Sequence, residues 1–205
     1  MIGTMNIRTL ALAPALLIAM AFPALAERIP LSEISRYLNS LTTVTSEFTQ
    51  INPDGTVSTG TVYIQRPGRV RFEYDNDPTL VLASGGNVAI FDGKSNGGPQ
   101  QYPLSQTPLS IILDANVNLG RQGMVTGHSE QNNGTVVTAQ DPQRPQNGTI
   151  QMVFTAPTEL RQWVVTDDTG QKTTVKGRND PCLAVLDPVR GAAPLTGGDC
   201  ILTIA

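Results

Sequence analysis

Residues suited to catalysis or metal binding are scarce in this sequence. It contains one histidine, His128, and two cysteines, Cys182 and Cys200. No G-x-S-x-G elbow, P-loop or dinucleotide-binding fingerprint occurs in it. The tripeptide His128-Ser129-Glu130 offers too few ligands for zinc, and its histidine follows Gly127, so we expect an exposed turn residue there. The sequence therefore predicts neither an enzyme nor a protein that needs a cofactor or a metal.

Charged residues are also sparse. They make up 15% of the 205 residues, with 14 Lys+Arg against 17 Asp+Glu, and the basic residues form no cluster. A mildly acidic chain of this kind argues against nucleic acid or an anionic membrane surface as the main partner. By contrast, 19 Gly and 15 Pro residues are typical of many short strands joined by turns.

One long apolar run occurs, and it lies near the N-terminus. Arg8 precedes an apolar stretch from Leu10 to Phe22, which is followed by Ala24-Leu25-Ala26, a small-x-small signal-peptidase pattern. Pro14 interrupts the stretch and Pro23 follows it directly, and it is shorter than the roughly 20 residues that a membrane-spanning helix needs. We therefore predict that residues 1–26 are a signal peptide, cleaved on export, and that the mature chain is soluble and begins at Glu27.

The mature chain is predicted to form one mainly β domain over residues 27–176. A helix is expected after Pro30, because Ile34, Leu38 and Leu41 recur at helical spacing. Strands are expected where β-branched and aromatic residues lie between turn signals: 46–50, 56–65, 69–74, 80–83, 88–91, 124–128, 135–139, 149–154, 159–166 and 172–176. Such a series predicts an antiparallel meander, a barrel or a strongly curved sheet.

The clearest alternation follows the turn Arg66-Pro67-Gly68. Proline fixes φ and glycine permits unusual dihedrals, so these residues interrupt the chain. From Arg69 to Tyr74, apolar side chains alternate with charged ones, which predicts a strand with Val70 and Phe72 on its apolar face. The opposite face is predicted to be solvated.

An apolar helical segment is expected between the two strand-rich halves. Thr107 and Pro108 form a typical helix start, and the residues up to Asp114 are mostly apolar. On a helix, Leu109, Ile112 and Leu113 share one face, while Ile111 turns partly away. Two interpretations remain open at this point: a core helix that plugs the end of a barrel, and a hydrophobic lid over a cavity.

Taken in order, these segments resemble the periplasmic outer-membrane lipoprotein carrier family (LolA-like) from about Ile29 to Lys176. The motifs that carry the resemblance are the leading helix, Ser46-Glu47-Phe48-Thr49-Gln50, Gly60 before the strand that ends at Gln65, the stretch from Arg66 to Tyr74, Pro78, the Asp92-Gly93 hairpin and the segment from Thr107 to Leu113. Their order and spacing make the resemblance specific.

The resemblance implies an unclosed antiparallel half-barrel that is covered by a helical lid and acts as a monomer in the periplasm. It implies that a hydrophobic cavity receives the acyl chains of lipoproteins from an inner-membrane ABC-type release complex and delivers them to an outer-membrane acceptor. The residue that matches Arg66 latches the lid in the empty state of that family. An exposed charge at a strand end is the alternative for Arg66.

For this cavity, alternation predicts that one set of apolar side chains points inward. The predicted lining comprises Val70, Phe72, Val88, Ile90, Ile150 and Phe154, together with the lid residues Leu109, Ile111, Ile112 and Leu113. The choice between Ile90 and Phe91 is open, because Ala89 and Phe91 form a second apolar face. The chain departs from the family in its few aromatic residues, which predict a more aliphatic lining, and in its C-terminal residues.

Two other functions and three forms of the tail are compatible with the sequence. The same half-barrel serves a periplasmic sensor or regulatory binding protein, and a hydrolase at the barrel mouth would have to use His128 as its base. We expect residues 177–205 to be a poorly ordered tail. A loop closed by a disulfide between Cys182 and Cys200, and a reading-frame error that replaces the family's usual ending, are the alternatives.

Overall fold

The computed structural model describes residues 28–132 and 134–177, so the predicted signal peptide, the two cysteines and the tail from residue 178 lie outside the described residues. The helical elements are α1 (Leu31–Ser40), the 3₁₀ helix η1 (Leu104–Gln106), α2 (Ser110–Leu113) and the 3₁₀ helix η2 (Pro145–Asn147). The strands of the N-terminal half are β1 (Thr43–Ile51), β2 (Val57–Gln65), β3 (Arg69–Tyr74), β4 (Leu80–Ser84), β5 (Asn87–Phe91) and β6 (Gln100–Pro103). Those of the C-terminal half are β7 (Val125–Gln131), β8 (Gly134–Ala139), β9 (Thr149–Thr155), β10 (Glu159–Thr166) and β11 (Lys172–Gly177).

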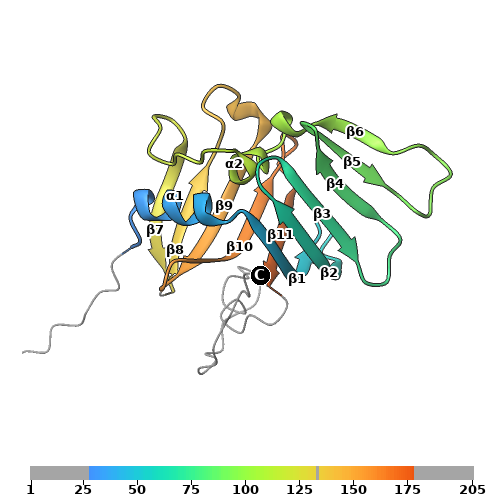
Figure 1. Cartoon of the computed structure of the whole chain (residues 1–205), viewed down its shortest axis with the longest axis horizontal. Helices are drawn as coiled ribbons and strands as arrows, with labels where there is room; N and C mark the ends of the chain where they lie inside the picture. The colour runs from blue at the N-terminus through green and yellow to red at the C-terminus, as the bar shows by residue number, and fades with distance from the viewer. Residues whose placement is uncertain (1–27, 133, 178–205) are drawn as a thin grey trace, which may run out of the picture.

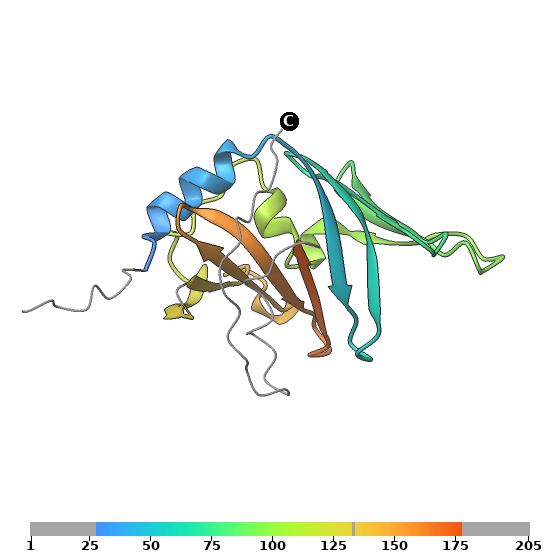
Figure 2. The same cartoon turned by 90° about the horizontal axis from the view of Figure 1, so that it is seen from below.

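All of these strands belong to one antiparallel sheet. Their order is β6-β5-β4-β3-β2-β1-β11-β10-β9-β8-β7, so β6 and β7 are its two edges in the described part of the chain and the sheet does not close. The sheet is strongly curved, and α2 lies between its two halves in both views (Figures 1 and 2). The predicted unclosed half-barrel is therefore confirmed.

The inner face of the sheet follows from alternation along each strand. On β3, Val70 and Phe72 are buried, whereas Arg69 and Arg71 are exposed, as predicted. On β9, Ile150, Met152 and Phe154 are all fully buried and face inward together. Because antiparallel partners share a face, these strands build one apolar interior between the two halves.

Two details of the strands differ from the sequence-based expectations. The sequence gives no sign of β6, because Gln100-Gln101-Tyr102-Pro103 lacks apolar alternation, and a long loop rather than a tight hairpin at Asp92-Gly93 connects it to β5. The expectation that His128 is an exposed turn residue was wrong. It lies on β7, half-buried, where its Nε2 is 3.0 Å from the carbonyl oxygen of Ile29.

Helix α1 lies across the C-terminal half of the sheet (Figure 1). Its own residues Ile34 and Leu38 are buried, at the spacing that the sequence predicted. The ring of Tyr37 packs edge-on against Phe154, with centroids 6.2 Å apart, and its hydroxyl oxygen accepts a hydrogen bond of 3.2 Å from the amide of Leu160. Burial raises the pKa of Tyr37, although the hydrogen bond from the Leu160 amide acts in the opposite direction.

Candidate functional site: the apolar interior and the Arg66-Pro67-Gly68 turn

The segment predicted as a lid lies inside the curve of the sheet. It is less regular than expected, because only Ser110–Leu113 form α2, while residues 107–110 make tight turns after η1. Ile111, Ile112 and Leu113 are buried, and Leu109 is half-buried. Ile111, which was expected to turn partly away from the face of the other three, belongs to the core cluster and also lines the polar cavity described below.

The predicted lining residues lie where the lid meets the sheet. Val70, Phe72, Val88, Ile150 and Phe154 belong to one continuous core cluster that also contains Ile111, Ile112 and Leu113. Leu109 packs against this cluster from its margin. Ile90 differs from the other predicted residues, because it is half-buried and does not join the cluster. The lid side chains thus occupy the space that the inner faces of the strands enclose.

Arg66 connects the β2–β3 turn to two other segments. Its Nη1 donates to the carbonyl oxygen of Leu38 in α1, and its Nη2 donates to the carbonyl oxygen of Asp114, which follows α2. The same Nη2 lies 3.2 Å from Oδ1 of Asn39. A planar guanidinium can serve several acceptors at once, whereas an ammonium presents a single charge centre. This geometry contradicts the interpretation of Arg66 as a free charge at a strand end.

The backbone of the same turn strengthens the contact with the lid. The amide of Gly68 donates to the carbonyl oxygen of Leu113 at 2.8 Å, so the turn binds the last residue of α2 directly. Gly68 has φ +71°, a conformation that glycine adopts without strain. The motif Arg66-Pro67-Gly68 therefore supplies both a side-chain donor and a backbone donor to the end of the lid.

The setting of Arg66 is only partly favourable to its charge. Burial lowers its pKa, and the carboxylate of Asp114 acts in the opposite direction. Its Nε is buried and has no hydrogen-bond partner among the described residues. An unsatisfied buried donor costs free energy, so the closed arrangement is held less tightly than the other Arg66 bonds alone would indicate.

Two polar residues of α1, which the sequence analysis did not single out, also contact the lid region. Asn39 Nδ2 donates to the carbonyl oxygen of Val117, and Asn39 Oδ1 accepts from the amide of Val117, each at 2.9 Å. One turn earlier, Ser35 Oγ accepts from the amide of Leu119 at 3.1 Å. The sequence does contain a pattern that could have pointed to these contacts. The two polar residues are four positions apart, and each is next to a buried apolar residue of the helix.

A separate cavity of about 270 Å³ lies on the polar side of the lid. Its walls combine apolar and charged side chains; they are Ser105, Ser110, Ile111, Asp114, Asn116, Val117, Asn118, Arg121, Met124, Asp141, Gln143 and Arg144. Arg144 Nε lies 3.3 Å from the Asp141 carboxylate, so charges of both signs face this space. These charged walls set the cavity apart from the apolar interior, with which it shares Ile111, Val117 and Met124.

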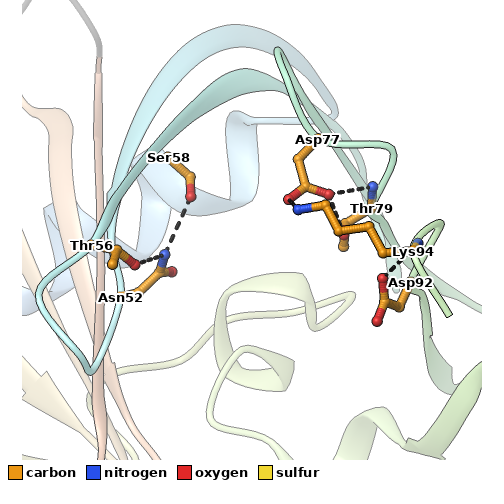
Figure 3. Close-up of polar contacts among 7 residues, drawn as sticks. All are labelled: Asn52, Thr56, Ser58, Asp77, Thr79, Asp92 and Lys94. Atoms are coloured by element: carbon orange, nitrogen blue, oxygen red, sulfur yellow. Dashed lines mark hydrogen bonds and ion pairs between the residues drawn. The ribbon is translucent and has the colours of Figure 1, made fainter.

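The β1–β2, β3–β4 and β5–β6 connections lie at the strand ends opposite the β2–β3 turn, and they contain their own polar contacts (Figure 3). Asn52 Nδ2 donates to Thr56 Oγ1 and to Ser58 Oγ, at 2.9 and 3.2 Å. Between the β5–β6 and β3–β4 connections, Lys94 Nζ lies 2.7 Å from the carboxylate of Asp77. The same carboxylate accepts hydrogen bonds from the backbone amide and the hydroxyl of Thr79. Asp77 thus serves as a turn residue, and the described residues contain no group of His, Cys, Asp or Glu arranged to hold a metal ion.

A curved, unclosed antiparallel sheet with an apolar inner face, against which a short helix packs, defines the half-barrel class of folds. The family model for the outer membrane lipoprotein carrier protein LolA matches residues 39–180, and the chain belongs to this family. No helix in the described residues is both long and apolar enough to span a membrane.

Individual relatives were found in sequence and in structure. An outer-membrane lipoprotein carrier protein of Methylococcus capsulatus is 33% identical over 82 residues, which cover 37% of this chain and 39% of that relative's length. An uncharacterized conserved protein of Thermus thermophilus aligns with a TM-score of 0.40 at 10% identity, over 72% of this chain and 82% of that one. The LolA superfamily protein NE2245 of Nitrosomonas europaea aligns with a TM-score of 0.34 at 10% identity, over 72% and 91%.

Proposed function

We propose that this protein is an exported, periplasmic carrier that binds the acyl chains of lipoproteins and transfers them from the inner to the outer membrane as a monomer. Its partners in this proposal are an inner-membrane ABC-type release complex and an outer-membrane acceptor. The observation that carries the proposal is the lid. Its apolar side chains fill the interior of the half-barrel, while polar bonds from Arg66 and Gly68 hold its end.

A filled interior suits a carrier for energetic reasons. Burial of one CH₂ group is worth about 0.8 kcal/mol, so a single chain of about 16 carbons would gain close to 12 kcal/mol if it were fully enclosed. Several such chains would exceed any known non-covalent affinity, and cargo would never leave. A lid that reoccupies the interior recovers part of this free energy on release, because lid and cargo compete for one apolar surface.

The proposal is tested by binding of an acylated peptide to the purified protein. An environment-sensitive apolar dye should bind, and a diacylated peptide should displace it, whereas the same peptide without acyl chains should not. Phe72→Glu should abolish binding, because it places a carboxylate in the interior. Arg71→Glu on the exposed face of the same strand is the matched control and should bind normally.

Transfer is measured separately, from the loaded protein to vesicles made of outer-membrane lipids. The proposal predicts that acylated protein co-purifies with the carrier from the periplasm and passes to the vesicles. Failure of the acylated peptide to displace the dye, together with normal behaviour of Phe72→Glu, would contradict the proposal.

A further inference from the structure

The polar cavity beside α2 shares one wall with the apolar interior. Ile111, Val117 and Met124 line the cavity, and all three also belong to the core cluster. They are 6%, 3% and 9% exposed, so one layer of buried side chains separates the two spaces. An acyl chain that took the place of Ile111 in the interior would therefore lie directly beside the polar cavity.

The polar walls of the cavity balance their charges. Two arginines, Arg121 and Arg144, stand against two carboxylates, those of Asp114 and Asp141. Arg121 Nη2 lies 3.8 Å from the Asp141 carboxylate, which is too far for a hydrogen bond. Within the described part of the chain, the N–H groups of Arg121 are therefore not committed to an acceptor. Arg144 approaches Asp141 with its Nε, at 3.3 Å.

The walls also contain two amide side chains that are available to a ligand. The side chains of Asn116 and Gln143 make no hydrogen bond to another described residue. Their backbone is held by the neighbouring carboxylates. The amide of Asn116 donates to Asp114 Oδ1 at 3.1 Å, and the amide of Gln143 donates to Asp141 Oδ1 at 2.9 Å. Ordered turns thus position both side chains before a ligand arrives, which lowers the cost of binding.

We propose that the polar cavity binds the peptide of an acylated cargo, over the residues that directly follow its acylated end. The inference rests on the proposed function and deepens it, because it assigns a site to the part of the cargo that an apolar interior cannot hold. A carboxamide donates and accepts hydrogen bonds as a peptide group does, so Asn116 and Gln143 suit a backbone of any sequence.

Charge and size both favour a short peptide over other occupants. An anionic headgroup would need uncompensated positive charge, but Asp114 and Asp141 balance the two arginines. A volume of about 270 Å³ is the space of roughly nine water molecules, which admits about two residues of extended chain and excludes a folded domain. The rest of the cargo protein would remain outside the half-barrel.

Dye displacement by two ligands with the same short acyl chains tests the proposal. One is a diacylated tetrapeptide, and the other is a diacylglycerol, which has no peptide. Asn116→Ala and Gln143→Ala should each weaken binding of the tetrapeptide by about two- to tenfold, the effect of one hydrogen bond, and leave binding of the diacylglycerol unchanged. Neither substitution removes a side-chain hydrogen bond between described residues, so a change in affinity reports on the ligand.

Gln146→Ala is the matched control. Gln146 is exposed and belongs to the same β8–β9 connection as Gln143, but it does not line the cavity. Both ligands should bind this variant as they bind the natural protein.

Peptide length gives a second measurement on the natural protein. Affinity should rise from one diacylated residue to about two residues and then stay constant, because the cavity holds no more. Unchanged tetrapeptide binding in both variants, or an equal loss of diacylglycerol binding, would overturn the inference. The same dependence on Asn116 and Gln143 for a diacyl phospholipid would overturn it too, because the cavity would then be a headgroup site. If neither acylated ligand displaces the dye, the proposed function fails and the inference fails with it.

Discussion

At the scale of single residues, the side chain of Arg66 joins the β2–β3 turn to two other segments. Its partners are in α1 and after α2, far from it in the chain. Charge-assisted hydrogen bonds are worth roughly 1.5–3 kcal/mol each, and solvent access reduces this at a half-exposed site. We expect Arg66→Leu to shift the empty protein toward the open form by about ten- to a hundredfold. Transfer assays should show normal loading and slower release.

Two further substitutions serve as controls for this prediction. Arg66→Lys should be nearly as harmful as Arg66→Leu, because an ammonium cannot serve the same spread of acceptors as a planar guanidinium. Arg69→Ala and Arg71→Ala should transfer cargo normally, since both side chains are on the exposed face of β3. Equal damage from Arg71→Ala would show that general charge, and not the latch, controls release.

Asp77 provides a prediction about pH. The hydrogen bond from Lys94, followed by those from Thr79, lowers the pKa of the Asp77 carboxyl from 3.8 to about 2. A carboxyl whose pKa is lower in the folded state stabilises the protein above its unfolded pKa, and loses this effect as pH falls through the folded value. Urea unfolding midpoints of the natural protein and Asp77→Asn should therefore differ near pH 6 and converge by about pH 2. A constant difference across that range would exclude this origin.

At the scale of elements, the lid is short but heavily buried. Leu113 is 2% exposed, and removal of a buried leucine side chain usually costs 2–5 kcal/mol in the free energy of unfolding, so Leu113→Ala should cost about that much. The same change should increase the affinity for a diacylated peptide, because the lid competes less well for the interior. Leu109→Ala is the matched comparison and should have smaller effects, since Leu109 is half-buried. Urea unfolding and dye displacement measure the two effects.

Strand β2 contains a glycine that the element requires. A Cβ at Gly60 would lie 2.9 Å from the Phe48 ring and would also clash with the backbone of Glu73. Phe48 packs edge-on against Phe72 and Tyr74, with ring centroids 5.4 Å away in each case. Gly60→Val should therefore lower the unfolding midpoint, because the added side chain would push against the Glu73 backbone of β3 and against the Phe48 ring, whereas Thr61→Val at the adjacent position should change it little.

At the scale of the whole molecule, the latch should contribute to the stability of one state only. Arg66→Leu should lower the melting temperature of the empty protein, because only the closed form contains the Arg66 bonds. Saturation with a diacylated peptide should bring both proteins to the same melting temperature, since cargo displaces the lid in each. Calorimetry with and without the peptide measures this. A deficit that persists in the loaded protein would mean that Arg66 supports the fold in general.

The sequence alone was sufficient for the features that depend on local chemistry. Alternation placed Val70 and Phe72 on the inner face of β3, and helical spacing placed Ile34 and Leu38 under α1. These predictions succeeded because the pattern of apolar side chains along one element decides which face is buried. Edge strand β6 was missed for the same reason, because its residues carry no such pattern.

The tertiary structure decided everything that depends on which segments meet. Ile111 is buried in the core cluster and Ile90 is not part of it, and both outcomes depend on how the sheet and α2 are placed in space. The pairing of Asn39 with Val117 joins residues 78 positions apart. An exposed-looking asparagine near the end of a helix does not reveal its partner, because contacts of this range depend on the packing of whole elements. The same holds for His128, whose contact with Ile29 exists only because the N-terminal segment runs beside β7 and β8.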